Sequence, residues 1–305
     1  MSHFSDRLAT ALVRCTNPVL VGLDPRLEQL PRSLTQEVDW LDLEAIADAC
    51  RIFCREVIDV VSPLVAAVKP QAAFFEQLGP PGMKALGDVI RYARQQHLIV
   101  ILDGKRNDIG STATAYANAY LGSSSPWAAD ALTVSPYLGE DSLTPFVQAA
   151  HKRDAGIFVL VKTSNPGGGT FQDLIAADET VYHHVAKLVE HLSSQAIGEQ
   201  GYGSIGAVVG ATYPEQLAEL RAVMPHCWFL VPGFGAQGGA ARDVADAFDE
   251  NGLGAIVNSS RGIIFAHSRD KYRDRFGEAR WQQAVEAATQ EMIQQLRAET
   301  RAGQL

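Results

Sequence analysis

Two carboxylates and a lysine stand close together in the segment Asp103–Ile109, whose sequence is DGKRNDI. They are Asp103, Lys105 and Asp108, and they follow Leu98–Leu102, an apolar run typical of a buried strand. Residues two positions apart in a strand project to the same side, so Asp103 and Lys105 should point into one small volume. Charges gathered in this way are costly unless each has a partner. A chain that places such a cluster at the end of a strand has a use for it, so we expect these residues to belong to a functional site.

A second lysine, Lys69, ends the preceding apolar run, Val65–Lys69. Neighbouring strands stand about 4.8 Å apart, so Lys69 can join the three charged residues that follow Leu98–Leu102 in a chain of alternating charges. The alternative interpretation is a structural salt-bridge network at the rim of the fold. We favour a functional role, because buried ion pairs contribute little net stability and need another reason to be present.

Two later segments are suited to binding phosphate. The loop Pro232–Gly239 is rich in glycine, so its backbone N–H groups can approach an anion closely, and Gln237 adds a neutral donor. The segment Asn258–Gly262 contains Arg261, whose planar guanidinium group fits phosphate oxygens. A glycine-rich loop alone is equally compatible with a plain turn, but its pairing with Arg261 predicts a phosphate site.

The elements that must position these residues alternate between short apolar runs and longer helical patterns. Eight runs are nearly continuous in apolarity, as expected for parallel strands buried on both faces. They are Val19–Leu23, Val65–Lys69, Leu98–Leu102, Ala131–Val134, Ile157–Val161, Ile205–Val209, Trp228–Val231 and Ala255–Val257. Helical patterns cover Leu43–Val61, Pro81–Gln96, Asp141–Lys152, Asp178–Ala196, Pro214–Val223 and Ala240–Glu250.

Eight such units in series predict an α/β fold, a single (β/α)8 TIM barrel that takes up residues 1–305 as one domain. The barrel core should span about residues 18–265, with extra helices at about residues 3–14 and at Glu278–Arg301. In this fold the chemistry lies where strands end, and phosphate usually binds after strands seven and eight. The runner-up is a doubly wound open sheet, which needs a different strand order.

Composition narrows the function classes. The formal net charge is -9 and no long Lys/Arg run occurs, which argues against binding to nucleic acid or to an anionic membrane. No stretch approaches the roughly 20 apolar residues of a membrane span. The N-terminal residues lack the pattern of a secretory signal, so we expect a cytoplasmic protein. The four cysteines and the eight histidines lack zinc-ligand spacing, so we expect no metal site.

Taken together, the motifs resemble the orotidine 5′-phosphate decarboxylase family. The likeness rests on motifs in the same order: Lys69, then Asp103-x-Lys105-x-x-Asp108-Ile109, then Pro232-Gly-x-Gly-Ala-Gln237 and Arg261. The chain length and the segments Val134–Gly139 and Thr163–Gly167 are similar to the longer, type 2 subfamily. The resemblance covers essentially residues 18–265.

The resemblance implies a carboxy-lyase that converts orotidine 5′-monophosphate to UMP and CO₂ in de novo pyrimidine biosynthesis. It implies direct decarboxylation to a carbanion at C6 of the pyrimidine, without a metal or an organic cofactor. Lys105 is then the proton donor, and Asp103 lies against the substrate carboxylate. Asp24 and Lys69 bind ribose hydroxyl groups.

The same resemblance implies a homodimer. Asp108, Ile109 and Thr112 match the family segment that reaches into the neighbouring subunit's site. Ser164 falls near the hydroxyl that contacts the pyrimidine. The remaining substrate contacts, to the 5′-phosphate, come from Gln237 and Arg261.

Three other classes stay open. A Mg²⁺-dependent sugar-phosphate decarboxylase or hexulose-phosphate synthase shares the D-x-K-x-x-D motif, but such enzymes carry an acidic residue where Lys69 stands, and a lysine repels the cation. A Schiff-base aldolase could use Lys105 or Lys69. A non-catalytic phosphate-binding barrel is disfavoured, because so many charges converge on one place.

Overall fold

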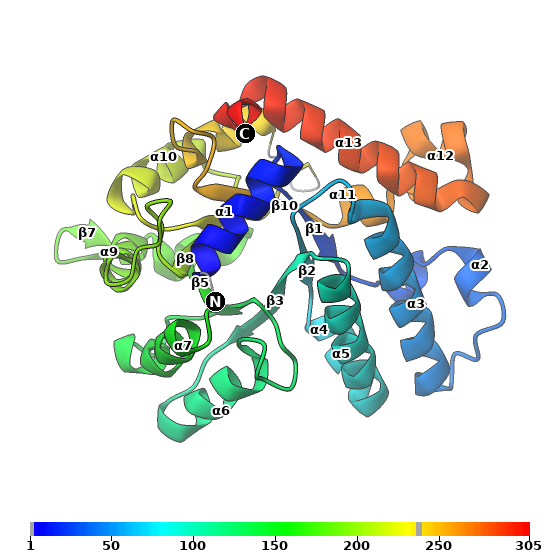
Figure 1. The fold of residues 1–305 in the computed structure, drawn as a ribbon, viewed down its shortest axis with the longest axis horizontal. Coiled ribbons are helices and arrows are strands. Elements are labelled where there is room, and N and C mark those ends of the chain that lie inside the picture. The colour runs from blue at the N-terminus through cyan, green and yellow to red at the C-terminus, as the bar shows by residue number, and fades with distance from the viewer. Residues whose placement is uncertain (1–2, 236–239) are drawn as a thin grey trace.

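The computed structural model describes residues 3–235 and 240–305. Within them, eight parallel strands close into a barrel surrounded by helices (Figure 1). The strands follow one another around the barrel in chain order, and the last pairs with the first. They are β1 (Val19–Leu23), β2 (Ala67–Pro70), β3 (Ile99–Arg106), β4 (Ala131–Val134), β5 (Gly156–Lys162), β8 (Ile205–Val209), β9 (Phe229–Val231) and β10 (Ala255–Ser259). The predicted TIM barrel is therefore confirmed, and the doubly wound open sheet is wrong.

The strands are apolar throughout because each has two buried faces. In β1, Val19 and Val21 belong to the large core between the strands and the outer helices, whereas Leu20 faces the barrel interior. The interior also contains Phe158 and Trp228, which are fully buried. Alternate side chains of a strand thus enter the outer core and the barrel interior. Both are apolar, so a polar residue inside a strand is an exception to the pattern.

The principal outer helices are α3 (Leu43–Val61), α5 (Gly79–Gln95), α6 (Gly110–Tyr120), α7 (Glu140–Lys152), α9 (Val181–Ser194), α10 (Pro214–Val223) and α13 (Trp281–Glu299). Five of the six predicted helices between strands are confirmed to within a few residues. Ala240–Glu250 is instead a 3₁₀ helix, η3 (Ala241–Ala247). Helix α6 was not predicted, because its sequence has no apolar stripe. It consists mainly of alanine and polar residues, and its buried residues are Ala113, Ala117 and Tyr120.

Shorter elements fill the connections at the ends of the strands. The helical ones are η1 (Leu27–Gln29), α2 (Arg32–Thr35), α4 (Ala73–Glu76), η2 (Pro166–Gly168), α8 (Gly169–Gln172), α11 (Arg261–Ile264), η4 (Ala266–Ser268), α12 (Asp270–Phe276), η5 (Glu278–Arg280) and η6 (Arg301–Gln304). A small hairpin joins β6 (Ile175–Ala176) to β7 (Glu179–Thr180). No described helix is long and apolar enough to cross a lipid bilayer.

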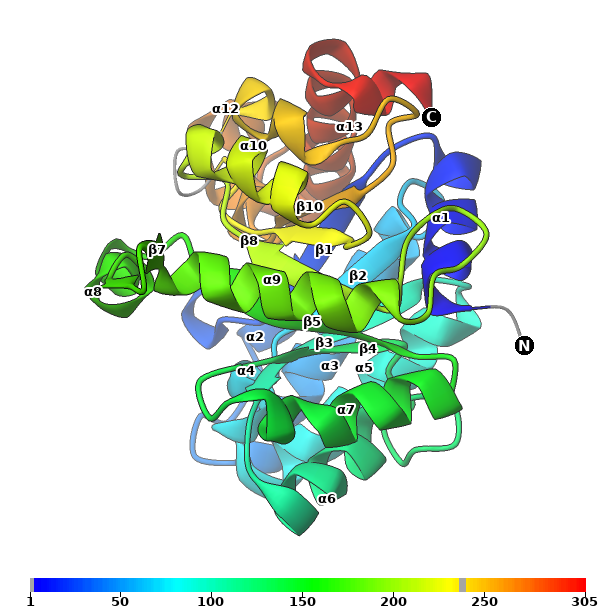
Figure 2. The same ribbon diagram turned by 90° about the vertical axis from the view of Figure 1, so that its left-hand side faces the viewer.

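Helix α1 (Phe4–Cys15) closes the amino end of the barrel, as Figures 1 and 2 show from two directions. Its buried residues Phe4, Leu8 and Leu12 lie one helical turn apart and join the interior core. The ring of Phe4 meets that of Phe158 edge-on, with centroids 6.3 Å apart. Gly156 makes room for it, because a Cβ there would lie 2.3 Å from the Phe4 ring. The carboxyl ends of the strands form the opposite mouth, where polar residues gather.

We predict that Phe4→Ala lowers the free energy of unfolding by about 3 kcal/mol, because it empties a packed site at the closed end of the barrel. Val13→Ala on the same helix should change it by less than about 0.5 kcal/mol, since Val13 is half-exposed. Urea denaturation followed by circular dichroism measures both. Equal effects of the two substitutions would show that α1 does not plug the barrel.

Candidate active site

A cavity of about 220 Å³ opens at the carboxyl ends of β1, β2, β3, β9 and β10. Most of its lining is polar, and it brings together side chains from positions far apart in the sequence. The lining residues are Asp24, Arg26, Lys69, Gln71, Asp103, Pro232, Gly233, Phe234, Asn258, Ser259, Ser260 and Arg261. Three regions singled out from the sequence therefore meet in one place: the charged motif, Asp24, and the segment around Arg261.

The carboxylate of Asp103 is the centre of this site and accepts four hydrogen bonds. Lys69 Nζ (2.7 Å) and Gln71 Nε2 (3.0 Å) donate to Oδ2, while Lys105 Nζ (2.6 Å) and Thr133 Oγ1 (2.9 Å) donate to Oδ1. Burial alone would raise the pKa of Asp103, but the two ammonium groups and their hydrogen bonds hold it well below its usual range. Asp103 is therefore ionised at neutral pH and fixed in orientation.

Lys69 is 4% exposed, an unusual position for an ammonium group. Burial lowers the pKa of Lys69, yet the nearby carboxylates of Asp103 and Asp24 outweigh this and raise it above its usual range. The lysine is thus kept charged by two acids on neighbouring strands. Strand pairing explains the arrangement, since Gly22 of β1 lies opposite Lys69 and Gln71 bridges to Asp103.

Lys105 stands at the rim, with 48% of its side chain exposed beside the buried carboxylate. Its backbone adopts a left-handed conformation, with φ of 44°, where the pairing of β3 with β4 shifts register. Such a conformation is costly for a residue with a side chain and persists only where its surroundings hold it. The hydroxyl of Thr133 does so, because it accepts from the N–H of Lys105 (2.9 Å) while donating to Asp103.

Two acceptors in the cavity lack a hydrogen-bond partner among the described residues. They are Oδ1 of Asp24 and Oδ1 of Asn258, and both are buried. Burial raises the pKa of Asp24, and the negative charge of Asp103 adds to the effect, whereas Lys69 opposes it. Unsatisfied buried acceptors are rare in folded proteins. Because both residues line one cavity, these two oxygens are suited to receive hydroxyl groups of a ligand.

Asp108 does not join the contacts of Asp103 in this chain. Its Oδ1 accepts from the N–H of Ile109 (2.8 Å), and no ion pair of Asp108 occurs within the described parts of the chain. The strand ends at Arg106 and the chain turns outward into α6, so the expected chain of four alternating charges has three members within one subunit. Ile109 is 58% exposed, and Thr112 is also exposed.

The other predicted binding residues lie around the same mouth. Ser164 follows β5 and packs against Gly210, where a Cβ would approach its backbone nitrogen to 2.9 Å. Arg261 starts α11 and is exposed, and no protein group in the described ranges pairs with its guanidinium group. Gln237 lies outside the described residues.

Sequence reasoning missed Gln71, Thr133 and Asn258. Gln71 could have been predicted as a site residue. It lies two residues beyond Lys69, so in extended chain its side chain projects to the same side as that of Lys69. A threonine inside the apolar run Ala131–Val134 was also a signal, since its hydroxyl needs a partner once buried. Among the described residues, no group of three or more His, Cys, Asp or Glu side chains is placed to hold a metal ion.

Comparison with known proteins agrees with these features. Residues 19–274 match the sequence model described as "Orotidine 5'-phosphate decarboxylase / HUMPS family". The orotidine 5′-phosphate decarboxylase of Rhodopirellula baltica is 60% identical to this chain over 301 residues, which cover 97% of this chain and 100% of the relative. The orotidine 5′-phosphate decarboxylase of Haloarcula marismortui is 44% identical over 291 residues, which cover 94% of this chain and 96% of the relative. The solved structure of Leishmania donovani OMP decarboxylase superposes with a TM-score of 0.76 at 35% identity, covering 98% of each chain.

We predict that Thr133→Val lowers the free energy of unfolding by about 1–3 kcal/mol, because the N–H of Lys105 and one oxygen of Asp103 lose their shared partner. Thr133→Ser keeps the hydroxyl and should cost less than about 1 kcal/mol for the lost methyl group. Chemical denaturation of both variants measures the difference. If valine is tolerated as well as serine, the hydroxyl does not hold the Lys105 turn.

Proposed function

Because the chain belongs to the orotidine 5′-phosphate decarboxylase / HUMPS family, we propose that it converts orotidine 5′-monophosphate to UMP and CO₂, a step of pyrimidine biosynthesis. It is a carboxy-lyase of a TIM-barrel family. The observation that carries the proposal is the Lys69–Asp103–Lys105 cluster at the barrel mouth, in which an ionised acid lies between two ammonium groups.

The cluster supports direct decarboxylation at C6 of the pyrimidine. The bond between C6 and the carboxylate breaks, CO₂ leaves, and the electron pair stays on C6. The ammonium group of Lys105 stabilises this carbanion as it forms and then transfers a proton from Nζ to C6. Its half-exposed position beside Asp103 allows the approach of a substrate. Solvent then returns a proton to the lysine.

The fixed charge of Asp103 favours the transition state over the bound substrate. A carboxylate kept ionised by four donors repels a substrate carboxylate placed against it, and that repulsion disappears as CO₂ departs. The attraction between Lys105 and the developing carbanion grows over the same interval. Both effects need charges that do not reorganise, which the surrounding hydrogen bonds provide.

The ribose, the 5′-phosphate and the pyrimidine ring can be assigned to the remaining residues around the mouth of the barrel. The ribose hydroxyl groups donate to Oδ1 of Asp24 and Asn258, which have no partner in the described chain, and lie near Lys69. The 5′-phosphate binds Arg261, whose guanidinium group pairs with no group in the described chain, together with Gln237. Ser164 contacts the pyrimidine from the β5 side.

The Mg²⁺-dependent alternative is disfavoured by Lys69. Its ammonium group lies within the acid cluster, 2.7 Å from Asp103, and repels a divalent cation at that point. We therefore propose that the enzyme works without a metal. The direct decarboxylation proposed above also needs no organic cofactor. Its proposed location is the cytoplasm.

We also propose that the active unit is a homodimer. Asp108, Ile109 and Thr112 lie outside the contacts of the Asp103 cluster, and Ile109 exposes a large apolar side chain. In the proposed dimer these three residues complete the partner's site. A site built from two chains accounts for the position of Asp108, which lies five residues from Asp103 in the sequence but does not join its hydrogen-bonded cluster.

Purified protein should decarboxylate orotidine 5′-monophosphate in the presence of EDTA, followed by the loss of orotidylate absorbance. Lys105→Ala should lower kcat by about 10²–10⁴-fold, because the proton donor is lost, while substrate binding partly survives. Lys84→Ala, which changes an exposed lysine on α5, is the matched control. A folded wild-type protein without turnover would contradict the proposed activity, and a near-normal kcat for Lys105→Ala would contradict the proposed role of Lys105.

The shared site can be tested with hybrid dimers. Lys105→Ala and Asp108→Asn should each be nearly inactive alone. A hybrid of the two has one site with both changes and one with neither, so an equimolar, re-equilibrated mixture should recover about a quarter of wild-type activity. No recovery, with hybrid formation verified by native mass spectrometry, would place Asp108 in its own subunit's site.

A further inference from the structure

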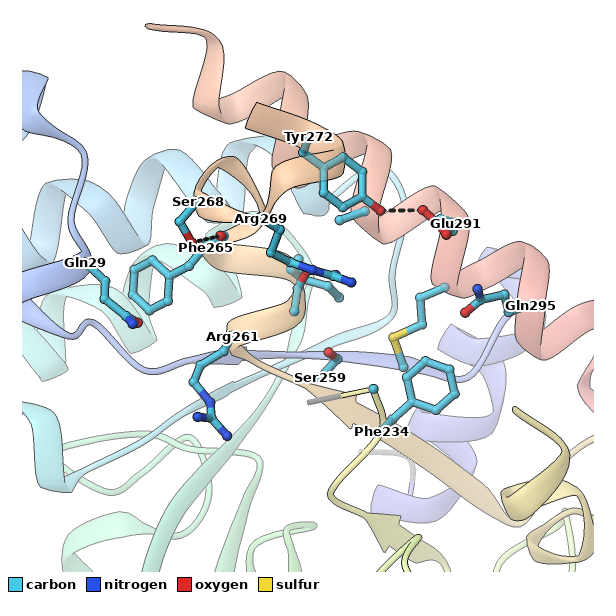
Figure 3. Close-up of a pocket in the computed structure, with 15 residues that line it drawn as sticks. Gln29, Phe234, Ser259, Arg261, Phe265, Ser268, Arg269, Tyr272, Glu291 and Gln295 are labelled. Carbon is cyan, nitrogen blue, oxygen red and sulfur yellow. Dashed lines mark hydrogen bonds between the residues drawn. The ribbon is translucent and has the colours of Figure 1, made fainter. Parts of the chain in front are cut away.

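A second cavity, of about 470 Å³, lies next to the active-site cavity (Figure 3). The two cavities share Phe234, Ser259 and Arg261, so they meet at the proposed phosphate end of the substrate. The second cavity is enclosed by α11, by the segment leading into α12, and by the C-terminal helix α13. The mechanism proposed above uses none of its other residues.

The charge of this cavity suits an anion. Of its fifteen lining residues, the cations are Arg261 and Arg269 and the carboxylate is Glu291. Glu291 is already paired, because Lys271 Nζ donates to both of its oxygens (2.6 Å each) and the hydroxyl of Tyr272 donates to one. The hydroxyl groups of Ser259 and Ser268 also line the space. The described residues that line the cavity therefore carry two positive charges against one negative charge, and that negative charge is shared with Lys271.

One hydrogen bond within the protein holds the guanidinium group of Arg269, and its other N–H groups can bind a ligand. Its Nη1 donates to the carbonyl oxygen of Gly262 (3.2 Å), the residue that follows Arg261, and its guanidinium group lies 5.5 Å from the centre of the Tyr272 ring. No ion pair holds it in the described chain. Figure 3 shows Arg269 extending into the cavity from the segment after α11, while the side chain of Arg261, at the start of α11, points away from Arg269. Its other N–H groups remain available in a planar fork suited to phosphate.

We propose that this cavity is a second phosphate subsite, in which Arg269 binds the terminal phosphate of a nucleoside 5′-diphosphate whose first phosphate lies on Arg261. The proposal rests on the proposed function, since it places the 5′-phosphate of the nucleotide at Arg261. A bound diphosphate occupies the substrate site and competes with orotidine 5′-monophosphate. Because nucleoside diphosphates arise from the product by phosphoryl transfer, this subsite makes the enzyme responsive to the compounds made from its product.

The test compares the binding of UMP and UDP to the full chain by calorimetry, alongside inhibition of decarboxylation. The wild-type protein should bind UDP at least as tightly as UMP. Arg269→Gln should raise the Kd of UDP about tenfold and that of UMP less than about twofold, the difference expected for one charge-assisted hydrogen bond. Arg273→Gln is the matched control, since Arg273 lies on α12, pairs with Asp270 and does not line the cavity.

The ratio of the two Kd values separates a subsite from structural support. If Arg269 only holds α11 through the carbonyl of Gly262, its substitution weakens UMP and UDP equally, and the proposal is overturned. Weaker binding of UDP than UMP by the wild-type protein also overturns it. If both nucleotides bind with the expected ratio but no decarboxylation occurs, the subsite stands and the proposed function fails.

Discussion

The carboxylate of Asp103 organises the mouth of this barrel. It accepts hydrogen bonds from Lys69 of β2, from Gln71 just beyond β2, from Lys105 of its own strand and from Thr133 of β4. A buried charge with so many donors is stable only while all of them are in place, because removing one leaves a desolvated charge partly unpaired. The position of each donor is therefore tied to the register of three adjacent strands. The barrel supplies that register, and the site in turn depends on the barrel being closed and packed.

The two ends of the site differ in whether their charged groups are paired within the protein. At the end proposed for the reaction, Lys69 and Lys105 are already paired with Asp103 before any ligand binds. Such preorganised charges do not rearrange during a reaction, which is the condition for stabilising a transition state. At the end proposed for phosphate and ribose, Arg261 and the buried acceptors of Asp24 and Asn258 have no hydrogen-bond partner among the described residues. Ligand binding energy can thus come from one end while the chemistry proceeds at the other.

Much of this arrangement could be predicted from the sequence, because hydrophobic runs and strand periodicity determine it. Eight apolar runs indicated the barrel, and the closeness of Lys69 to Asp103 followed from the spacing of neighbouring strands. The left-handed turn at Lys105 could not be predicted, since it depends on a register shift and on the hydroxyl of Thr133 across the sheet. The family resemblance implied that Asp108 lies outside this cluster, but strand periodicity did not, because its position depends on where β3 ends and α6 begins.

The C-terminal helices α12 and α13 lie beside the active site and line the second cavity. Helix α13 packs against α11, the short helix that starts with Arg261, and α12 packs against α13. Residues of all three line the cavity beside the proposed phosphate end of the site. Trp281 at the start of α13 stacks near Phe53 of α3, with centroids 5.2 Å apart, and fixes the helix to the barrel wall. Arg269 and the paired Glu291 then face each other across a cavity that a barrel ending near residue 265 would leave open. What the helix adds is therefore a wall at the end proposed to bind anions, while the Asp103 cluster is complete without it.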